Sequence, residues 1–333
     1  MARKSRSNAQ IRRGSTSIGN QDQGITKITV SGYKSLLTSQ SIDVKPITVL
    51  AGANSSGKSS ILQPLLLLKQ TLDASYDPGS LLLDGPNVRF TATAQFLSKR
   101  NVAEQVDCVT ISIQFGKEQS LEIVFAKGSN EPMSIRSMTS TRGSEKLVLT
   151  SEMSDHEIRK ALPDELKSFV ETIEKVQKSS VTCFVKRNRC FLDVAFRLPK
   201  ERGGGLFMLG PSGHDQDRHI RRIIHLPGLR GNPERTYPVT AVGTDFPGTF
   251  EKYVASVIAQ WQTEEGKNLE GLNNDLAELG LTWKVLAKRV SETQAAIEIG
   301  RVQFETERAG HDLVSIADVG FGVSQVLPVV VAL

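Results

Sequence analysis

The pattern of apolar and polar residues divides the chain near position 24. Residues 1–24 hold almost no apolar side chains, whereas apolar positions recur from Ile25 onward. Residues 25–30 and 47–50 are rich in β-branched residues and predict strands, and residues 58–72 have an apolar face of helical length. A glycine-rich turn separates the second strand from this helix. The order strand, glycine-rich loop, helix is typical of a phosphate-binding loop.

The rest of the chain contains segments with the two-residue hydrophobic repeat of strands and segments with the repeat of helices. Period-two alternation predicts a β-meander over 108–128 and strands over 181–198, and a charged helix broken by Pro163 is expected over 155–179. A flexible loop is expected over 200–219, followed by a strand that runs into a Pro/Gly-rich turn over 221–239. Helices are expected over 248–278 and 282–290, and one or two strands over 295–307. The last segment, 311–333, is expected to form a strand, a glycine turn and an apolar helix.

Composition and charge narrow the class of protein. Of the 333 residues, 39% are hydrophobic and 23% are charged, which fits a globular protein with a real core. No apolar run approaches the roughly 20 residues that a membrane span needs. Residues 1–24 carry five basic side chains against Asp22, so this tail holds +4 of the net charge of +5. The tail is interpreted as a disordered arm, with a nucleic-acid-binding arm and an organelle transit peptide as alternatives.

Cysteine usage points to a reducing compartment. Cys108, Cys183 and Cys190 are odd in number and lack CxxC spacing, which argues against a disulfide framework and a zinc site. We therefore expect a cytoplasmic protein without a membrane anchor. Cys183 and Cys190 are interpreted as ordinary core or edge residues of one strand or hairpin.

Residues 52–59 match the motif G-x-x-x-x-G-K-[ST]. The two glycines allow a tight turn in which several backbone N–H groups face one concavity, and the following helix adds its positive N-terminal end. Lys58 would reach the phosphates and the Ser59 hydroxyl would bind Mg²⁺. The alternative is a fortuitous Gly/Ser turn. The residues expected to bind ATP and Mg²⁺ are Gly52, Asn54, Ser55, Ser56, Gly57, Lys58, Ser59 and Ser60.

Hydrolysis needs more than this loop, usually an acidic residue at the end of an apolar strand that holds the metal. The candidate for this acid is "LLLD" at 81–84, three apolar residues followed by Asp84. Asp84 follows the loop closely and precedes Gly-Pro, so the segment is interpreted as a turn. The catalytic residues are therefore left unassigned.

Four segments together resemble one family. "SGYKSL" at 31–36, "SSGKSSILQPLLLLKQTL" at 55–72, "IIHLPGLRGNPERTY" at 223–237 and "DVGFGVSQVLPVV" at 318–330 stand in the order found in the SMC/RecF/OLD-like branch of ABC-type ATPases. The segment at 223–237 resembles the one found in a bacterial subgroup of that branch, the AAA-type ATPases with a C-terminal domain of unknown function. The resemblance covers the chain from about Ile25 to its end.

The resemblance implies roles for the last two segments. In that family the signature segment contacts the γ-phosphate held by a partner's loop, which would place Gly322, Ser324 and Gln325 at the phosphate of a second head. The alternative is a glycine-rich turn that only packs. Arg230, Arg235 and Tyr237 match the subgroup pattern, either as a structural turn clamp or as a phosphate or nucleic-acid contact.

The resemblance also implies an architecture. We expect an α/β P-loop head of the ABC type, with a mixed sheet and a β-rich and helical insertion. The expected parts are a tail over 1–24 and an incomplete ATPase head over 25–333, divided into a nucleotide-binding N-lobe over 25–84, the insertion over 85–245, and a helical lobe with the signature segment over 246–333. The family's metal-binding acids would follow Leu333, so a truncated or split ATPase is favoured over a sensor that does not hydrolyse ATP.

Two functions of different classes remain. The first is an ATPase whose ATP-gated head dimerisation acts in DNA repair or antiviral defence, with DNA and a nuclease or other effector protein as partners and a homodimer or higher oligomer as the assembly. The second is a nucleotide-binding assembly subunit that does not hydrolyse ATP alone. A transporter ATPase is disfavoured because about 260 residues separate the loop from the signature segment.

Overall fold

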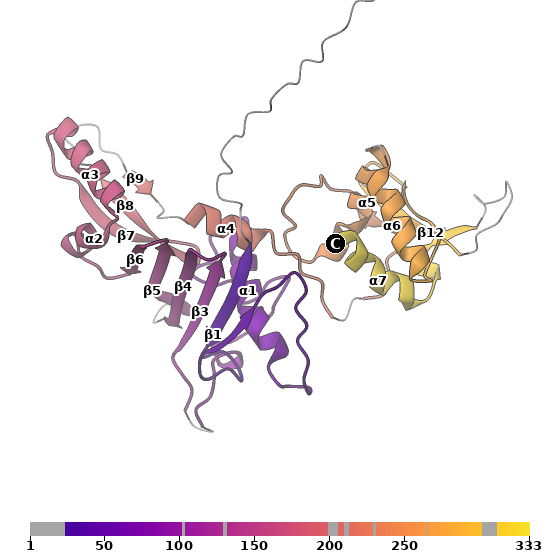
Figure 1. Cartoon of the computed structure of the whole chain (residues 1–333), viewed down its shortest axis with the longest axis horizontal. Coiled ribbons are helices and arrows are strands. Elements are labelled where there is room, and N and C mark those ends of the chain that lie inside the picture. The colour runs from indigo at the N-terminus through magenta and orange to yellow at the C-terminus, as the bar shows by residue number, and fades with distance from the viewer. Residues whose placement is uncertain are drawn as a thin grey trace, which may run out of the picture.

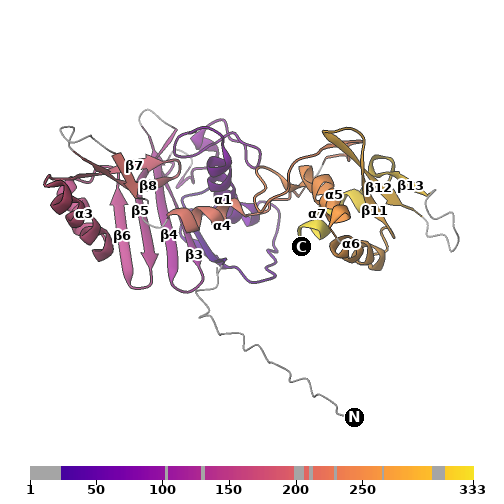
Figure 2. The ribbon, with the colours of Figure 1, turned by 90° about the horizontal axis from the view of Figure 1, so that it is seen from above.

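The computed structural model describes residues 24–101, 104–128, 132–198, 206–209, 213–228, 231–264, 266–301 and 312–333. They form two bodies with separate apolar cores (Figures 1 and 2). Buried residues of the first core run from Ile28 to Ile220, and those of the second run from Phe250 to Val331. The tail expected over 1–24 lies outside the described residues, apart from Gly24. The division at 84 and 245 stays a prediction.

The first body is built on one six-stranded sheet in the order β2-β1-β3-β4-β5-β6. Along β3 every second residue is buried, so one face of the sheet turns to the core. The meander expected over 108–128 is confirmed. The strands are β1 (Ile25–Ser31), β2 (Gln40–Asp43), β3 (Cys108–Phe115), β4 (Gln119–Lys127), β5 (Met133–Arg142) and β6 (Glu145–Thr150).

Helix α1 (Lys58–Asp73) packs against this sheet and confirms the helix predicted after the loop. Its leucine-rich side is buried, and Leu67 and Leu68 are 1% and 0% exposed. Helix α4 (Gly213–Arg221) lies beside α1, and Ile220 of α4 is fully buried. The flexible loop expected over 200–219 is therefore wrong where the structure describes it, because β9 (Leu206–Leu209) and α4 form there.

The strand predicted at 47–50 is not formed. The backbone of residues 46–51 makes no hydrogen bond to any described residue, and Ile47 and Val49 are 85% and 80% exposed. A strand needs a hydrogen-bonded neighbour, and β1 already has β2 and β3 on its two sides. The residues have strand propensity, but the described chain offers no strand for them to pair with.

A small subdomain follows the large sheet. Helix α2 (Asp155–Ala161) begins with a capping box between Ser154 and Glu157, and α3 (Asp164–Gln177) begins after Pro163, as predicted. Strands β7 (Thr182–Asn188), β8 (Phe191–Arg197) and β9 form a second antiparallel sheet. Cys183 and Cys190 are buried free thiols of the β7–β8 hairpin, as expected.

The second body surrounds a sheet of β10 (Tyr237–Pro238), β12 (Gln294–Gly300) and β11 (Val285–Arg289), with β13 (Leu313–Ser315) beside β12. Helix α5 (Val254–Thr263) packs against it. The body also contains α6 (Lys267–Glu278), α7 (Phe321–Ala332) and the 3₁₀ turns η3 (Phe250–Lys252) and η4 (Ile316–Asp318); a third 3₁₀ turn, η1 (Thr93–Gln95), belongs to the first body.

One expectation for the second body is wrong, another is wrong at the end of the first body, and a third concerns all the sheets. The helix over 282–290 is replaced by β11, whose Val285 and Ala287 are buried in alternation, and the strand near 221 is replaced by the end of α4. Every pairing between described strands is antiparallel, so the mixed sheet is not seen in this part of the chain. The α/β content itself is confirmed.

Candidate nucleotide-binding site

The glycine-rich turn leads directly into α1, which begins at Lys58. Its N-cap, Gly57, has a φ of +94°, a left-handed conformation that side chains disfavour. A Cβ atom at position 57 would lie 2.8 Å from the Ser35 Oγ atom. The left-handed conformation is what favours glycine at position 57.

The turn presents unused hydrogen-bond donors. The backbone N–H groups of Ser60 and Ile61 donate to the Gly57 carbonyl, whereas those of Lys58 and Ser59 donate to no described residue. The Lys58 ammonium folds back over the loop and donates to the carbonyls of Gly52 and Ala53 at 2.7 and 2.6 Å. Free N–H groups at a helix N-terminus beside a lysine suit an anion.

A cavity of about 450 Å³ opens at this point. Its walls are Lys34, Ser35 and residues 54–60, which include all but Gly52 of the loop residues expected to bind ATP. Two lysines and five serines line it, and none of its described lining residues is a carboxylate. The Ser59 side chain is exposed at the N-terminus of α1, which fits the role of a hydroxyl that binds Mg²⁺.

The structure adds two residues that the motif does not contain. The Lys34 Nζ atom donates to the Gln63 Oε1 atom at 2.7 Å and lies 5.0 Å from the centre of the Phe90 ring. The Tyr33 hydroxyl donates to the same oxygen at 3.2 Å. Burial lowers the pKa of Lys34 and raises that of Tyr33. Lys34 is thus a second cation of the cavity, held by a helix residue one turn beyond the loop.

Asp84 lies away from this cavity. It forms a β-bridge with Arg89, and the turn around it is bound by Gln70, which donates to the carbonyls of Leu82 and Val88. Gln70 is twelve residues along α1 from Lys58, or about 18 Å. The prediction that this segment is a turn is confirmed. Among the described residues no group of three His, Cys, Asp or Glu side chains could hold a metal.

The signature segment lies in the other body, at the start of α7 (Figure 1). Gly320 is the N-cap, and Phe321 and Gly322 are exposed at the helix N-terminus. Ser324 is 8% exposed and its hydroxyl donates to the Phe321 carbonyl at 3.2 Å. Gln325 is half-buried on the first turn. Among the described residues, the loop therefore belongs to the first body and the signature segment to the second.

Two residues of the 223–237 segment, Arg235 and Tyr237, have partners among the described residues. Arg235 forms an ion pair with Asp318, and the Tyr237 hydroxyl accepts a hydrogen bond from the Glu234 N–H at 3.0 Å. Tyr237 also pairs with Ala295 in the sheet. Arg230 lies outside the described residues.

A glycine-rich turn, the N-terminus of a helix and an inward-facing lysine define the P-loop class of nucleotide-binding proteins. The chain belongs to the family of the AAA ATPase domain, whose model matches residues 24–190, just over half of the chain. No curated protein and no solved structure matches it. No described helix is long and apolar enough to cross a membrane.

Proposed function

We propose that this protein binds ATP with Mg²⁺ and is an ATPase of the SMC/RecF/OLD-like type. The observation that carries the proposal is the loop at the start of α1, where Lys58 and the free N–H groups line a cavity of about 450 Å³. The Gly57 conformation keeps this backbone in the shape that a phosphate needs. Three free thiols agree with a reducing compartment such as the cytoplasm.

ATP-gated dimerisation is the second part of the proposal. Because the signature segment and the loop lie in different bodies of one chain, contact between them is best made across two copies. Exposed Phe321 and Gly322 at the N-terminus of α7 would face the γ-phosphate held by a partner's loop. Ser324 would act only after releasing the Phe321 carbonyl. DNA and a nuclease or other effector are the further partners proposed from the family.

A nucleotide-binding assembly subunit without turnover is the alternative function. It is favoured by one observation: the described cavity wall contains no carboxylate that could bind the metal or activate water. Under this alternative the nucleotide would control assembly, and a second chain would supply the acid.

The test is ATP binding and Mg²⁺-dependent hydrolysis on the purified chain, with Lys58→Ala beside the wild type. Lys117→Ala is the matched control, since Lys117 is an exposed lysine in the β3–β4 turn. The proposal expects Lys58→Ala to lose ATP affinity and the control to retain it. Equal affinity in all three proteins would remove the P-loop assignment. Binding without turnover would favour the assembly subunit.

A further inference from the structure

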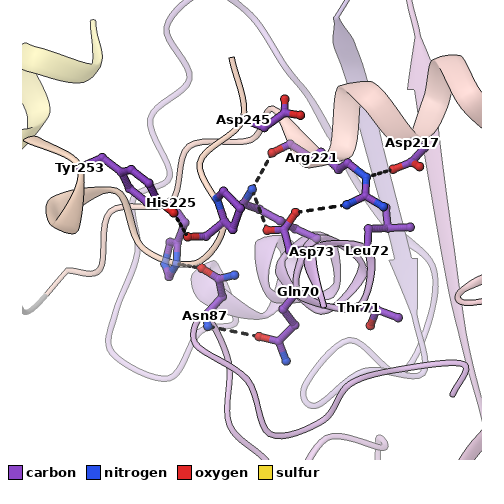
Figure 3. A network of polar contacts seen from close by, with 12 residues as sticks. Gln70, Thr71, Leu72, Asp73, Asn87, Asp217, Arg221, His225, Asp245 and Tyr253 are labelled. Atoms are coloured by element: carbon purple, nitrogen blue, oxygen red, sulfur yellow. Dashed lines mark hydrogen bonds and ion pairs between the residues drawn. The ribbon is translucent and has the colours of Figure 1, made fainter. Parts of the chain in front are cut away.

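The boundary between the two bodies contains a buried polar cluster. Lys69, on α1, is fully buried and lies 3.1 Å from the Asp73 carboxylate, one helical turn away. The Lys69 ammonium also donates to the Arg221 carbonyl at the end of α4, at 2.5 Å. Figure 3 shows Asp73 beside Arg221, which is bound in turn by Asp217.

The same cluster holds the segment that leads into the second body. The Gly248 backbone lies close to the Asp73 carboxylate, two residues before Phe250 of the second core, and the Phe250 N–H donates to the His225 carbonyl at 3.0 Å. His225 contacts the Asn87 Oδ1 atom at 2.9 Å, and the Asn87 N–H donates to Gln70 of α1 (Figure 3). His225 lies between the last residue of the first core, Ile223, and the first of the second, Leu226.

Stability alone does not explain this arrangement. A buried ion pair contributes little net stability because desolvation of both charges offsets their attraction, and apolar residues of similar volume often do as well. Burial raises the pKa of Asp73 despite the nearby Lys69 and Arg221. What such a pair supplies is a fixed geometry, because each buried charge can occupy only the place where it is compensated.

Helix α1 connects this geometry to the phosphate loop. It runs 16 residues, about 24 Å, from Lys58 in the loop to Asp73 in the cluster. A displacement of its N-terminus on phosphate binding would be carried to its other end, where Lys69 pairs with Asp73 and fixes the end of α4, four residues before His225.

We propose that Lys69 and Asp73 are positioning residues that set the orientation of the second body, and with it the signature segment, according to the occupancy of the phosphate loop. The inference rests on the proposed nucleotide-binding function. Under this proposal the cluster couples nucleotide binding at the phosphate loop of the first body to the position of the signature segment in the second body.

The test measures the distance between the bodies with spin labels at Lys117→Cys in the β3–β4 turn and Glu278→Cys in α6, both exposed positions, in a Cys108→Ser background. The other two native thiols are buried. Distances are recorded with and without Mg·ATP. The variant Lys69→Met/Asp73→Leu removes both buried charges together. The control Glu171→Leu/Lys175→Met makes the same change at an exposed pair of the same spacing on α3.

We expect a Mg·ATP-dependent shift in distance in the wild type and in the control, and loss of that shift in the cluster variant at unchanged ATP affinity. A merely structural pair would alter stability and leave the shift in place, which would overturn the inference. A wild type that binds ATP without a shift would also overturn it and leave the proposed function standing. A wild type that does not bind ATP would overturn both this inference and the proposed nucleotide-binding function.

A second variant covers the case in which the cluster variant does not fold. Asn87→Ala removes the contact to His225, which lies between the two cores, and leaves both buried charges paired. We expect a smaller Mg·ATP-dependent shift at unchanged ATP affinity. A shift of wild-type size in Asn87→Ala would count against the inference.

Discussion

Arg235 and Asp318, 83 positions apart in the sequence, form a two-pronged ion pair. The Arg235 Nη1 and Nη2 atoms lie 3.1 and 2.8 Å from the two carboxylate oxygens of Asp318. Asp318 ends η4 and stands two residues before Gly320, the N-cap of α7. The ion pair thus joins the segment 223–237 to the signature segment 318–330. Through Asp318, Arg235 holds the backbone that leads into α7.

The first prediction concerns the energy of this pair. Because the side chains of Arg235 and Asp318 are 73% and 48% exposed, we expect Arg235→Ala to lower the free energy of unfolding by less than about 1 kcal/mol. A double-mutant cycle with Asp318→Asn, measured by chemical denaturation, gives the coupling energy. A coupling well above about 1 kcal/mol would mean that the pair is part of the core of the second body.

The second prediction concerns the cation that the motif does not contain. Lys34 lines the cavity with Lys58, so Lys34→Met should weaken ATP binding by about tenfold or more, as expected for loss of one charged contact of about 1.5 kcal/mol. Titration calorimetry at two salt concentrations measures this loss. Lys45→Met, at an exposed lysine outside the cavity, is the control. An unchanged affinity in Lys34→Met would place the phosphates elsewhere in the cavity.

The third prediction concerns the far end of α1. The last turn of this helix has no basic residue of its own, but the Arg189 guanidinium donates to the carbonyls of Thr71, Leu72 and Ala74 at 3.0, 2.6 and 2.7 Å. A cation suits the negative end of a helix. We expect Arg189→Met to lower the free energy of unfolding by about 1–3 kcal/mol.

Arg187→Met provides the comparison for Arg189→Met. Arg187 stands on the same hairpin and pairs with Asp77, whose side chain is 55% exposed, so its loss should cost less than about 1 kcal/mol. Thermal and chemical denaturation of both variants measure how much unfolding free energy each substitution removes. Equal losses would show that Arg189 does not cap α1.

Local signals in the sequence were sufficient for the elements that depend on local contacts. The loop and α1 follow from glycines, a lysine and an apolar face within 22 residues, and the break between α2 and α3 follows from Pro163. The strand at 47–50 failed because a strand depends on a neighbour that the sequence does not specify. The segment 285–289 failed because a short apolar run fits a helix or a strand.

Contacts between distant segments fix side-chain placements at the site that spacing in the sequence does not specify. Lys34 meets Gln63 across 29 residues, and Arg189 reaches Leu72 across 117. No fixed separation in the sequence predicts either contact, because each depends on how a loop or hairpin packs against α1. The same holds for Lys69, which reads in sequence as one more polar position of an amphipathic helix and is fully buried in the structure.

The last prediction concerns pH and His225. Burial and the positive charge of Lys69 lower the pKa of His225, so the neutral ring is favoured at pH 7 and its Nδ1–H donates to Asn87. The unfolded chain then binds a proton more readily than the folded one, and the contribution of His225 to stability is present above about pH 6.5 and lost as pH falls through the lowered pKa. Melting temperatures of wild type and His225→Gln between pH 7.5 and 5 isolate this contribution from that of other titrating groups. We expect the difference between the two proteins to shrink as pH falls, because the wild type loses stability that the variant does not have. A difference that is constant over this range would mean that His225 has the same pKa in the folded and unfolded chain.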